Sequence, residues 1–164
     1  MALPDIDGRQ VRPLENSRAK AVVFLFTRSD CPISNRYAPE VERLHSKFAP
    51  GGFEFWLVYV DPTESDDAIR RHVQAYGYHF GALIDRKHAL VSLAKPAVTP
   101  EAAVYVNGRL VYRGRIDNRY SSFGKARQAA TEHDLEQTLE AIADGRPLTP
   151  RTTRAVGCFI EDLK

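Results

Sequence analysis

A run of six apolar residues, Ala21 to Phe26, constrains the fold of this chain more than any other segment. The run is far shorter than the about 18 residues of a membrane span, and it lacks the apolar–polar alternation of a half-exposed strand. A strand of this kind is buried on both faces, as in a parallel or mixed sheet. We therefore expect it at the centre of the molecule.

The residues after this strand predict a β-α-β unit. Residues 34–48 carry an apolar side chain at every third or fourth position, which is typical of an amphipathic helix. These positions are Tyr37, Val41, Leu44 and Phe48. Gly51 and Gly52 end that helix, and residues 53–60 form a second buried run. A strand, a crossover helix and a second strand indicate a parallel pair.

The middle of the chain predicts a second crossover. Ser65 precedes two acidic residues and is expected to cap a helix that ends near Tyr76. A short strand over residues 82–84 and a short helix over residues 87–94 are expected to follow.

A hairpin and a last helix complete the pattern. Asn107-Gly108 lies between β-prone residues 101–106 and 109–115, and both turn residues tolerate positive φ. This pair is the clearest hairpin signal in the sequence. The last helix is expected from Lys125 to Asp144, where Gly145 ends it.

This order of elements is that of an α/β protein with a thioredoxin-like fold, in which helices flank a central mixed sheet. A chain of 164 residues fits one hydrophobic core. We expect one domain over residues 1–145, followed by a C-terminal tail over residues 146–164.

Composition and charge narrow the classes of partner. The 23 basic and 21 acidic residues leave a net charge of +2, too small a surplus to favour nucleic acid or an anionic membrane. The first residues lack the basic and then apolar layout of a signal peptide. The compartment stays open: exported or periplasmic if a signal peptide was removed, and cytoplasmic otherwise.

Only two cysteines occur, Cys31 and Cys158, which excludes a disulfide scaffold and a four-cysteine zinc site. The five histidines form no metal-binding spacing, so no metal or other cofactor is expected. Cys31 stands between the first strand and its helix, where free N–H groups and the helix dipole favour a thiolate. We expect its pKa to lie below the free value of about 8.5. The alternative is a small residue that fills the junction.

Several segments resemble the redoxin branch of the thioredoxin superfamily, which holds alkyl hydroperoxide reductase-related peroxidases and thiol-disulfide oxidoreductases. The match extends over nearly the whole chain and includes the segments Leu3–Arg9, Asp30–Glu40, Thr99–Glu101, Tyr112–Tyr120 and, in the tail, Arg154–Cys158. The most specific of them contains Cys-Pro-Ile-Ser-Asn-Arg-Tyr, which begins at Cys31. The resemblance implies that the Thr99–Pro100 bond is cis and faces Cys31, which acts as nucleophile against a disulfide or a peroxide.

Two positions depart from that pattern. Ser34 stands where Cys-x-x-Cys reductases have their resolving thiol. Peroxiredoxins carry Thr or Ser three residues before the reactive cysteine, but Arg28 holds that place and Thr27 lies one residue further back. The expected catalytic residues are Cys31, Cys158, Thr27, Ser34 and Pro100.

Cys158 is the candidate for the missing second sulfur. About thirteen residues separate it from the last helix, and they span about 40 Å when extended, so they can reach Cys31. An unpaired tail cysteine, or one bonded to another chain, are the alternatives.

Two functions follow from these residues. The first is a thiol-based oxidoreductase whose partners are a disulfide-bearing protein or a peroxide and an external thiol reductant. The second is a redox-inert or copper-related binding module on the same fold, as in Sco-type chaperones. The missing Cys-x-x-x-Cys motif counts against the second function.

Overall fold

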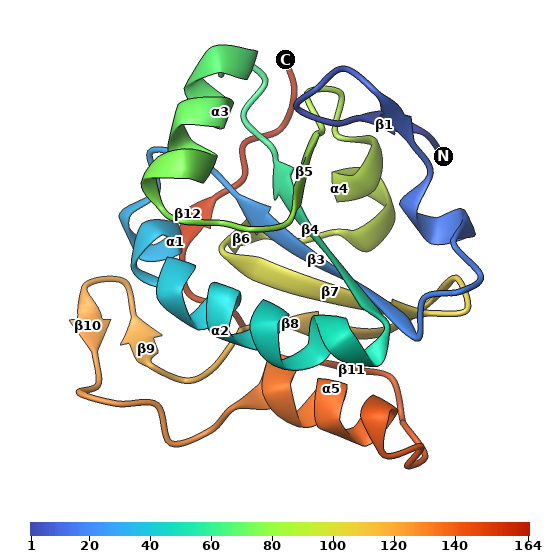
Figure 1. The fold of residues 1–164 in the computed structure, drawn as a ribbon. Helices are drawn as coiled ribbons and strands as arrows, with labels where there is room; N and C mark the ends of the chain where they lie inside the picture. The colour runs from blue at the N-terminus through green and yellow to red at the C-terminus, as the bar shows by residue number, and fades with distance from the viewer.

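The computed structural model describes residues 1–164 and has a central sheet of six strands in the order β11-β8-β7-β3-β4-β5 (Figure 1). Strand β3 (Ala21–Thr27) lies in the middle, and all seven of its residues are buried. It pairs in parallel with β4 (Phe53–Tyr59) and antiparallel with β7 (Glu101–Val106). Val23 and Phe24 pack into the cores on opposite faces of the sheet. The predicted central, doubly buried strand is confirmed.

The other strands complete both sides of this sheet. Strand β5 (Gly81–Ile84) runs parallel to β4, and β8 (Arg109–Gly114) forms the predicted hairpin with β7. Asn107 and Gly108 turn that hairpin with φ of 50° and 75°. Strand β11 (Arg151–Thr152) lies parallel to β8 at the edge.

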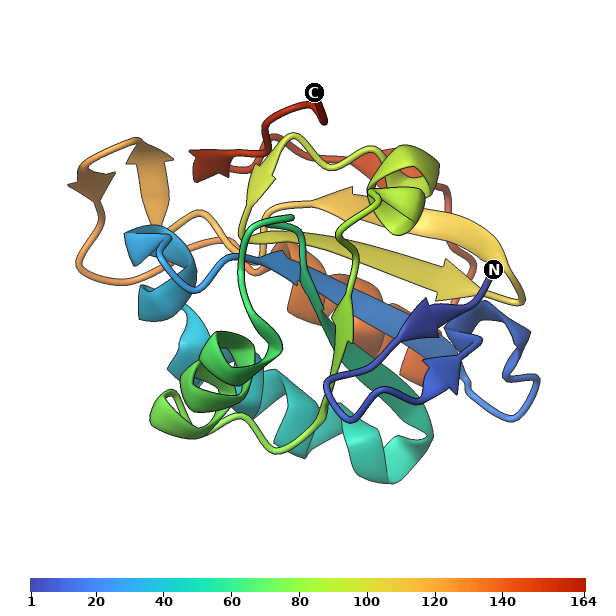
Figure 2. The same cartoon turned by 90° about the horizontal axis from the view of Figure 1, so that it is seen from above.

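Helices cover both faces of the sheet. The bounds are α1 Pro32–Arg36, α2 Ala38–Phe48, α3 Asp66–Ala75, α4 Ala89–Ala94 and α5 Asp134–Ala143, with 3₁₀ turns at Pro13–Glu15 and Ala49–Gly51. Leu44 of α2, Ile69 of α3 and Leu139 of α5 share one core. Leu90 of α4 packs on the other face with Leu3, which lies in a hairpin of β1 (Leu3–Pro4) and β2 (Gln10–Val11). Figure 2 shows α2 and α4 on opposite sides of the sheet.

The single helix expected over residues 34–48 is wrong, because the structure divides it at Tyr37 and starts it earlier, at Pro32. Pro39 has no N–H to donate to the carbonyl of Asn35, and its ring crowds that carbonyl. The helix that begins next to Cys31 is therefore only five residues long.

The expected start of the last helix at Lys125 is also wrong, because α5 begins at Asp134. Strands β9 (Tyr120–Ser122) and β10 (Lys125–Ala126) form a small hairpin in its place. The side-chain oxygen of Asn118 accepts the N–H groups of Thr131 and Glu132 at 2.8 and 2.9 Å. Those N–H groups are then unavailable to a helix, so the helix starts after them.

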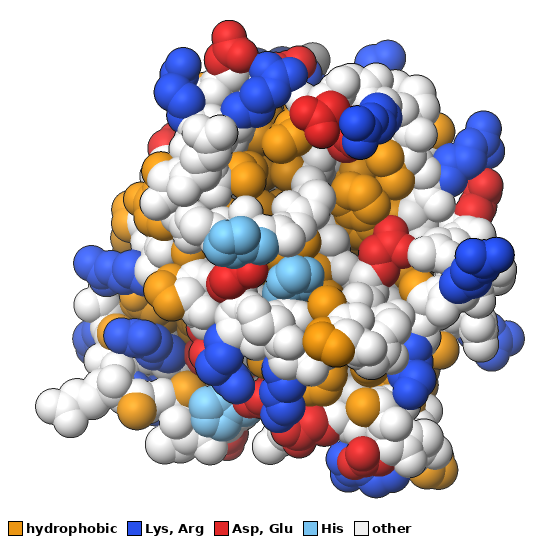
Figure 3. All heavy atoms as spheres, in the orientation of Figure 1, with side chains coloured by type: hydrophobic (Ala, Val, Ile, Leu, Met, Phe, Trp, Pro, Cys, Tyr) orange, Lys and Arg blue, Asp and Glu red, His pale blue; other side chains and the backbone are white.

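The tail folds back onto the body of the molecule. After β11 it passes Thr153 and reaches β12 (Cys158–Phe159), which pairs antiparallel with β6 (Val98–Thr99). No helix is both long and apolar enough to cross a membrane. Lys and Arg side chains are interspersed with Asp and Glu on the face in Figure 3, which agrees with the small net charge.

Candidate functional site

Cys31 is the N-terminal capping residue of α1, directly after the loop that leaves β3. Its side chain is 1% exposed. The N–H of Ser34 lies 3.5 Å from Cys31 Sγ, and Pro32 occupies the first helical turn, where a missing N–H costs nothing. The local sequence thus aims one backbone donor at the sulfur.

Cys31 and Cys158 are joined by a disulfide bond, although they are 127 residues apart in the sequence. Their Cα atoms lie 6.1 Å apart, within the range that a disulfide requires. The tail therefore brings to Cys31 the second sulfur that helix α1 lacks.

The loop before β7 lies against this bridge. The Thr99–Pro100 bond is cis, as predicted, and Cys31 Sγ lies 3.2 Å from the carbonyl oxygen of Thr99. The buried Glu101 carboxylate accepts the N–H of Ala97 at 3.2 Å and pairs with Arg113 at 3.4 Å. Burial raises the pKa of Glu101, and these two partners oppose the rise. Glu101 thus fastens the loop that lines the disulfide.

Strand β12 holds Cys158 in place through its backbone. Cys158 pairs with Thr99 and Phe159 with Val98, and the N–H of Ile160 donates to the carbonyl of Ala97 at 3.1 Å. The side chain of Phe159 is 78% exposed. Val156 and Ile160 are partly buried against the two cores, so backbone pairing, the disulfide and this packing together hold the segment.

Three buried hydroxyls near the disulfide lack hydrogen-bond partners: those of Thr27, Ser34 and Thr99. The groups of Ser34 and Thr99 that lie near Cys31 Sγ are the backbone N–H of Ser34 and the backbone carbonyl of Thr99. Thr27 ends β3, and no hydrogen bond joins its hydroxyl to the sulfur. The structure thus brings Cys31, Cys158, Ser34 and the Thr99–Pro100 loop together.

The guanidinium of Arg28 is paired with carboxylates and is not free to stabilise a Cys31 thiolate. It pairs with Asp30 at 3.2 Å and with Asp61 at 3.3 Å. Two carboxylates therefore neutralise the arginine that holds the peroxiredoxin threonine position.

A buried network that the sequence did not indicate ties α1 to α3. Asn35 donates to the carbonyl of Ser29 at 2.9 Å and accepts from His72 Nε2 at 2.7 Å. His72 Nδ1 accepts from the hydroxyl of Tyr59 at 2.7 Å. Burial lowers the pKa of His72, which favours its neutral form. The only sequence signal was the place of His72 in a helix, which does not distinguish it from a surface histidine.

Tyr37 and Asp117 form a second buried pair, near Pro100. The hydroxyl of Tyr37 donates to Asp117 at 2.6 Å, and burial together with Asp117 raises the pKa of Tyr37. A cavity of about 10 Å³, the size of one water molecule, lies between these residues and Pro100.

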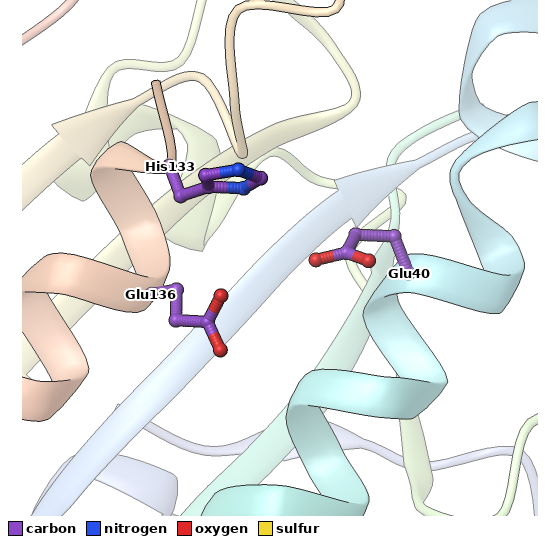
Figure 4. Close-up of side chains that lie close together, drawn as sticks. All are labelled: Glu40, His133 and Glu136. Atoms are coloured by element: carbon purple, nitrogen blue, oxygen red, sulfur yellow. The ribbon is translucent and has the colours of Figure 1, made fainter. Parts of the chain in front are cut away.

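Two carboxylate clusters have the geometry of metal ligands. Glu40, His133 and Glu136 face one another between α2 and α5 (Figure 4). Arg43 donates to Glu40 at 2.6 Å and to Glu136 at 2.8 Å, so its guanidinium already balances the charge of these carboxylates. The second cluster is Asp30, Asp61 and Glu64, and Arg28 pairs with its two aspartates. A metal ion would have to displace a salt bridge at either place.

Comparisons with known proteins find a matching family and several related proteins. The AhpC/TSA family model matches residues 1–106. Thiol-disulfide oxidoreductase ResA of Halalkalibacterium halodurans is 29% identical over 84 residues, which are 51% of this chain and 46% of ResA. ResA of Bacillus thuringiensis is 25% identical over 87 residues, 53% of this chain and 49% of that protein. The chain thus spans about half the length of the curated relatives it matches.

Solved structures give the fold. A hypothetical protein from Sinorhizobium meliloti has a TM-score of 0.83 at 25% identity, with 98% of this chain and 89% of that chain covered. The thioredoxin domain of a thiol-disulfide oxidoreductase from Bacteroides vulgatus has a TM-score of 0.64 at 16% identity, with 87% and 92% covered. The predicted thioredoxin-like fold is confirmed.

Proposed function

This chain belongs to the AhpC/TSA family, and from that premise we propose that it is a thiol-disulfide oxidoreductase whose redox centre is the Cys31–Cys158 pair. One observation carries the proposal. The only two cysteines, far apart in the sequence, are bonded at the start of α1 and beside the Thr99–Pro100 loop. A bridge that merely fastened the tail would not need this position.

The proposed reaction transfers two electrons to a disulfide-bearing partner protein. In the reduced chain, the Cys31 thiolate attacks one partner sulfur, and the partner's second sulfur leaves as a thiolate. The Cys158 thiolate then attacks Cys31 Sγ, which releases the first partner sulfur and closes the Cys31–Cys158 bond. The partner has lost one disulfide and this chain has gained one. An external thiol reductant reopens the bond by the same exchange.

Other residues assist this exchange. We assign the N–H of Ser34, which lies 3.5 Å from Cys31 Sγ, to stabilisation of the Cys31 thiolate. Ser34 itself cannot resolve a mixed disulfide because it has no thiol. Thr27 has a buried hydroxyl at the end of β3 but makes no hydrogen bond to the sulfur, so we assign it no step in the exchange. Pro100 follows Thr99, whose carbonyl oxygen lies 3.2 Å from Cys31 Sγ.

A disulfide fits this site better than a peroxide does. Peroxide attack needs a hydroxyl directed at the substrate oxygens from the position three residues before Cys31. Arg28 occupies that position and is paired with Asp61 and Asp30. The chain therefore lacks that donor, whereas thiol exchange requires only two sulfurs within reach.

Matched single variants test the proposal. Reduced Cys158→Ser is expected to form a stable mixed disulfide with a small aromatic disulfide such as dithiodipyridine, because its resolving thiol is gone. Reduced Cys31→Ser keeps one thiol in the tail and is expected to react much more slowly. Mass spectrometry of the intact chains measures both products. Equal rates for the two variants would contradict Cys31 as nucleophile.

A further inference from the structure

Gly157 lies against the loop that lines the disulfide. A Cβ atom at this position would overlap the carbonyl oxygen of Thr99 and lie 2.6 Å from its carbonyl carbon and 3.2 Å from Pro100 N. The φ of Gly157 lies outside the left-handed range, so any residue could adopt its backbone conformation. The close approach of Thr99, and not the backbone conformation, therefore requires a glycine at position 157.

The rest of the tail contact combines backbone pairing with partial burial of Val156 and Ile160. Strand β12 pairs with β6 over two residues, and Phe159 points mostly to solvent. The hydrogen bond from Ile160 to Ala97 uses only backbone atoms. Because every extended polypeptide offers the same N–H and C=O groups, the β6 edge can pair with another chain in the same way.

We propose that the Cys31 site selects partner polypeptides in which a glycine directly precedes the reacting cysteine, and that residues 157–160 are an internal copy of that ligand. This inference rests on the function proposed above. A partner segment paired with β6 in the register of β12 would place its cysteine opposite Thr99, within bonding distance of Cys31. The preceding residue would then face Pro100, where a side chain collides with the Thr99 carbonyl.

The exchange also explains how the internal copy leaves. A partner thiolate attacks Cys31 Sγ of the oxidised chain, the bond from Cys31 to the partner forms, and Cys158 leaves as a thiolate. The tail before this point stays attached, because the N–H of Thr153 donates to the carbonyl of Arg113 at 3.0 Å. Only the residues after Thr153 need to move away from β6.

A pair of peptides tests the selection. The first has the tail sequence Ala-Val-Gly-Cys-Phe-Ile and the second has alanine in place of glycine; each carries a thiopyridyl group on its cysteine as a mixed disulfide. Reduced Cys158→Ser attacks the peptide sulfur and releases thiopyridone, whose absorbance gives the rate. We expect the glycine peptide to react at least about 10-fold faster. Dithiodipyridine, which has no peptide, serves as the control for the reactivity of Cys31.

Two failures can be told apart. Equal rates for the two peptides, with a normal reaction of dithiodipyridine, would overturn the glycine selection and leave the proposed function standing. No reaction of Cys31 with any of the three disulfides would overturn the proposed function itself.

A variant of the chain gives a second readout. Gly157→Ala is expected to slow oxidative closure of the Cys31–Cys158 bond at least about 10-fold, since its new methyl group meets the Thr99 carbonyl. Gly51→Ala is the matched control, because Gly51 also has an ordinary φ and its nearest neighbour would be 3.9 Å away. Closure at the same rate in both variants would contradict the inference.

Discussion

The two strands of the tail are attached to the body of the protein by different interactions. Strand β11 extends the main sheet and is followed by Thr153, whose hydroxyl bonds to Tyr112 at 2.6 Å and accepts the N–H of Arg115 at 3.0 Å. Strand β12 has no side-chain hydrogen bond; it is held by the bond from Cys158 to Cys31 and by partial burial of Cys158 and Ile160 against the cores.

This difference shows how one tail can be both fixed and mobile. The contacts around β11 do not depend on redox state, because none of them involves sulfur. The attachment of β12 is covalent in the oxidised chain, and in the reduced chain it depends on a two-residue backbone ladder and on partly buried apolar side chains. Such a short ladder is weak by itself. Reduction should therefore free only the end of the tail.

Removing the disulfide should have the largest effect. Cys158→Ser is expected to lower the free energy of unfolding by about 4 kcal/mol relative to the oxidised chain, since the bond closes a loop of over a hundred residues. Denaturant titration measures this loss. Hydrogen exchange should show faster exchange of the Ile160 amide while the Thr153 amide stays protected. Equal loss of protection at both amides would contradict the expected difference between the attachments of β11 and β12.

Gly114→Ala should weaken the attachment of β11, because the new side chain meets Thr153. The φ of Gly114 is 151°, and a Cβ atom would overlap the hydroxyl of Thr153 and lie 2.6 Å from its carbonyl oxygen. We expect a loss of about 2 kcal/mol and faster exchange at Thr153, while the disulfide still forms. Gly124→Ala is the control for backbone strain alone, because its φ is 82° with no atom nearby. Similar losses in the two variants would mean that the β11 contact adds little.

Thr153→Val tests the hydroxyl without adding strain. It removes the bonds to Tyr112 and Arg115 N and leaves a partly buried N–H unpaired, so we expect a loss of about 1.5 kcal/mol. Thr153→Ser keeps the hydroxyl and should restore most of the stability. Thermal melting of the two oxidised variants makes the measurement, and equal melting temperatures would remove the hydroxyl from the explanation.

Arg151→Gln should have the smallest effect. Arg151 pairs with Asp134 at 3.0 Å, but its side chain is 48% exposed and solvent screens the pair. We expect a loss of about 0.5 kcal/mol that disappears in about 1 M salt. Denaturant titration at low and high salt checks this. A larger loss that salt does not change would show that packing of Arg151 over the Tyr112 ring matters more than its charge.

The sequence predicted those parts of the fold whose signal is local. The run Ala21–Phe26 indicated a buried central strand, and Asn107-Gly108 indicated the hairpin, because apolar runs and turn residues act at short range. Thr99-Pro100 was identified through its place before the hairpin, and the cis bond is confirmed. The start of α5 was missed, because Asn118 fixes that start from outside the helix.

The residues of the candidate site also differ in whether the sequence indicated them. Cys31 at a strand-to-helix junction could be read from the sequence, because the junction is defined by adjacent residues. The network of Asn35, His72 and Tyr59 could not, because its members lie on three elements that meet only in the folded chain.

By itself the sequence determined that two cysteines exist, that one lies at a helix start and that the tail is long enough to join them. The tertiary structure alone decided where the second cysteine lies. In the tail only Val156, Cys158 and Ile160, near its end, contact the cores, so its path also depends on free backbone groups at the edges of β8 and β6. It depends also on the space that Gly157 leaves beside Thr99. Such edges exist only after the sheet has formed, because strands distant in sequence must first pair to create them.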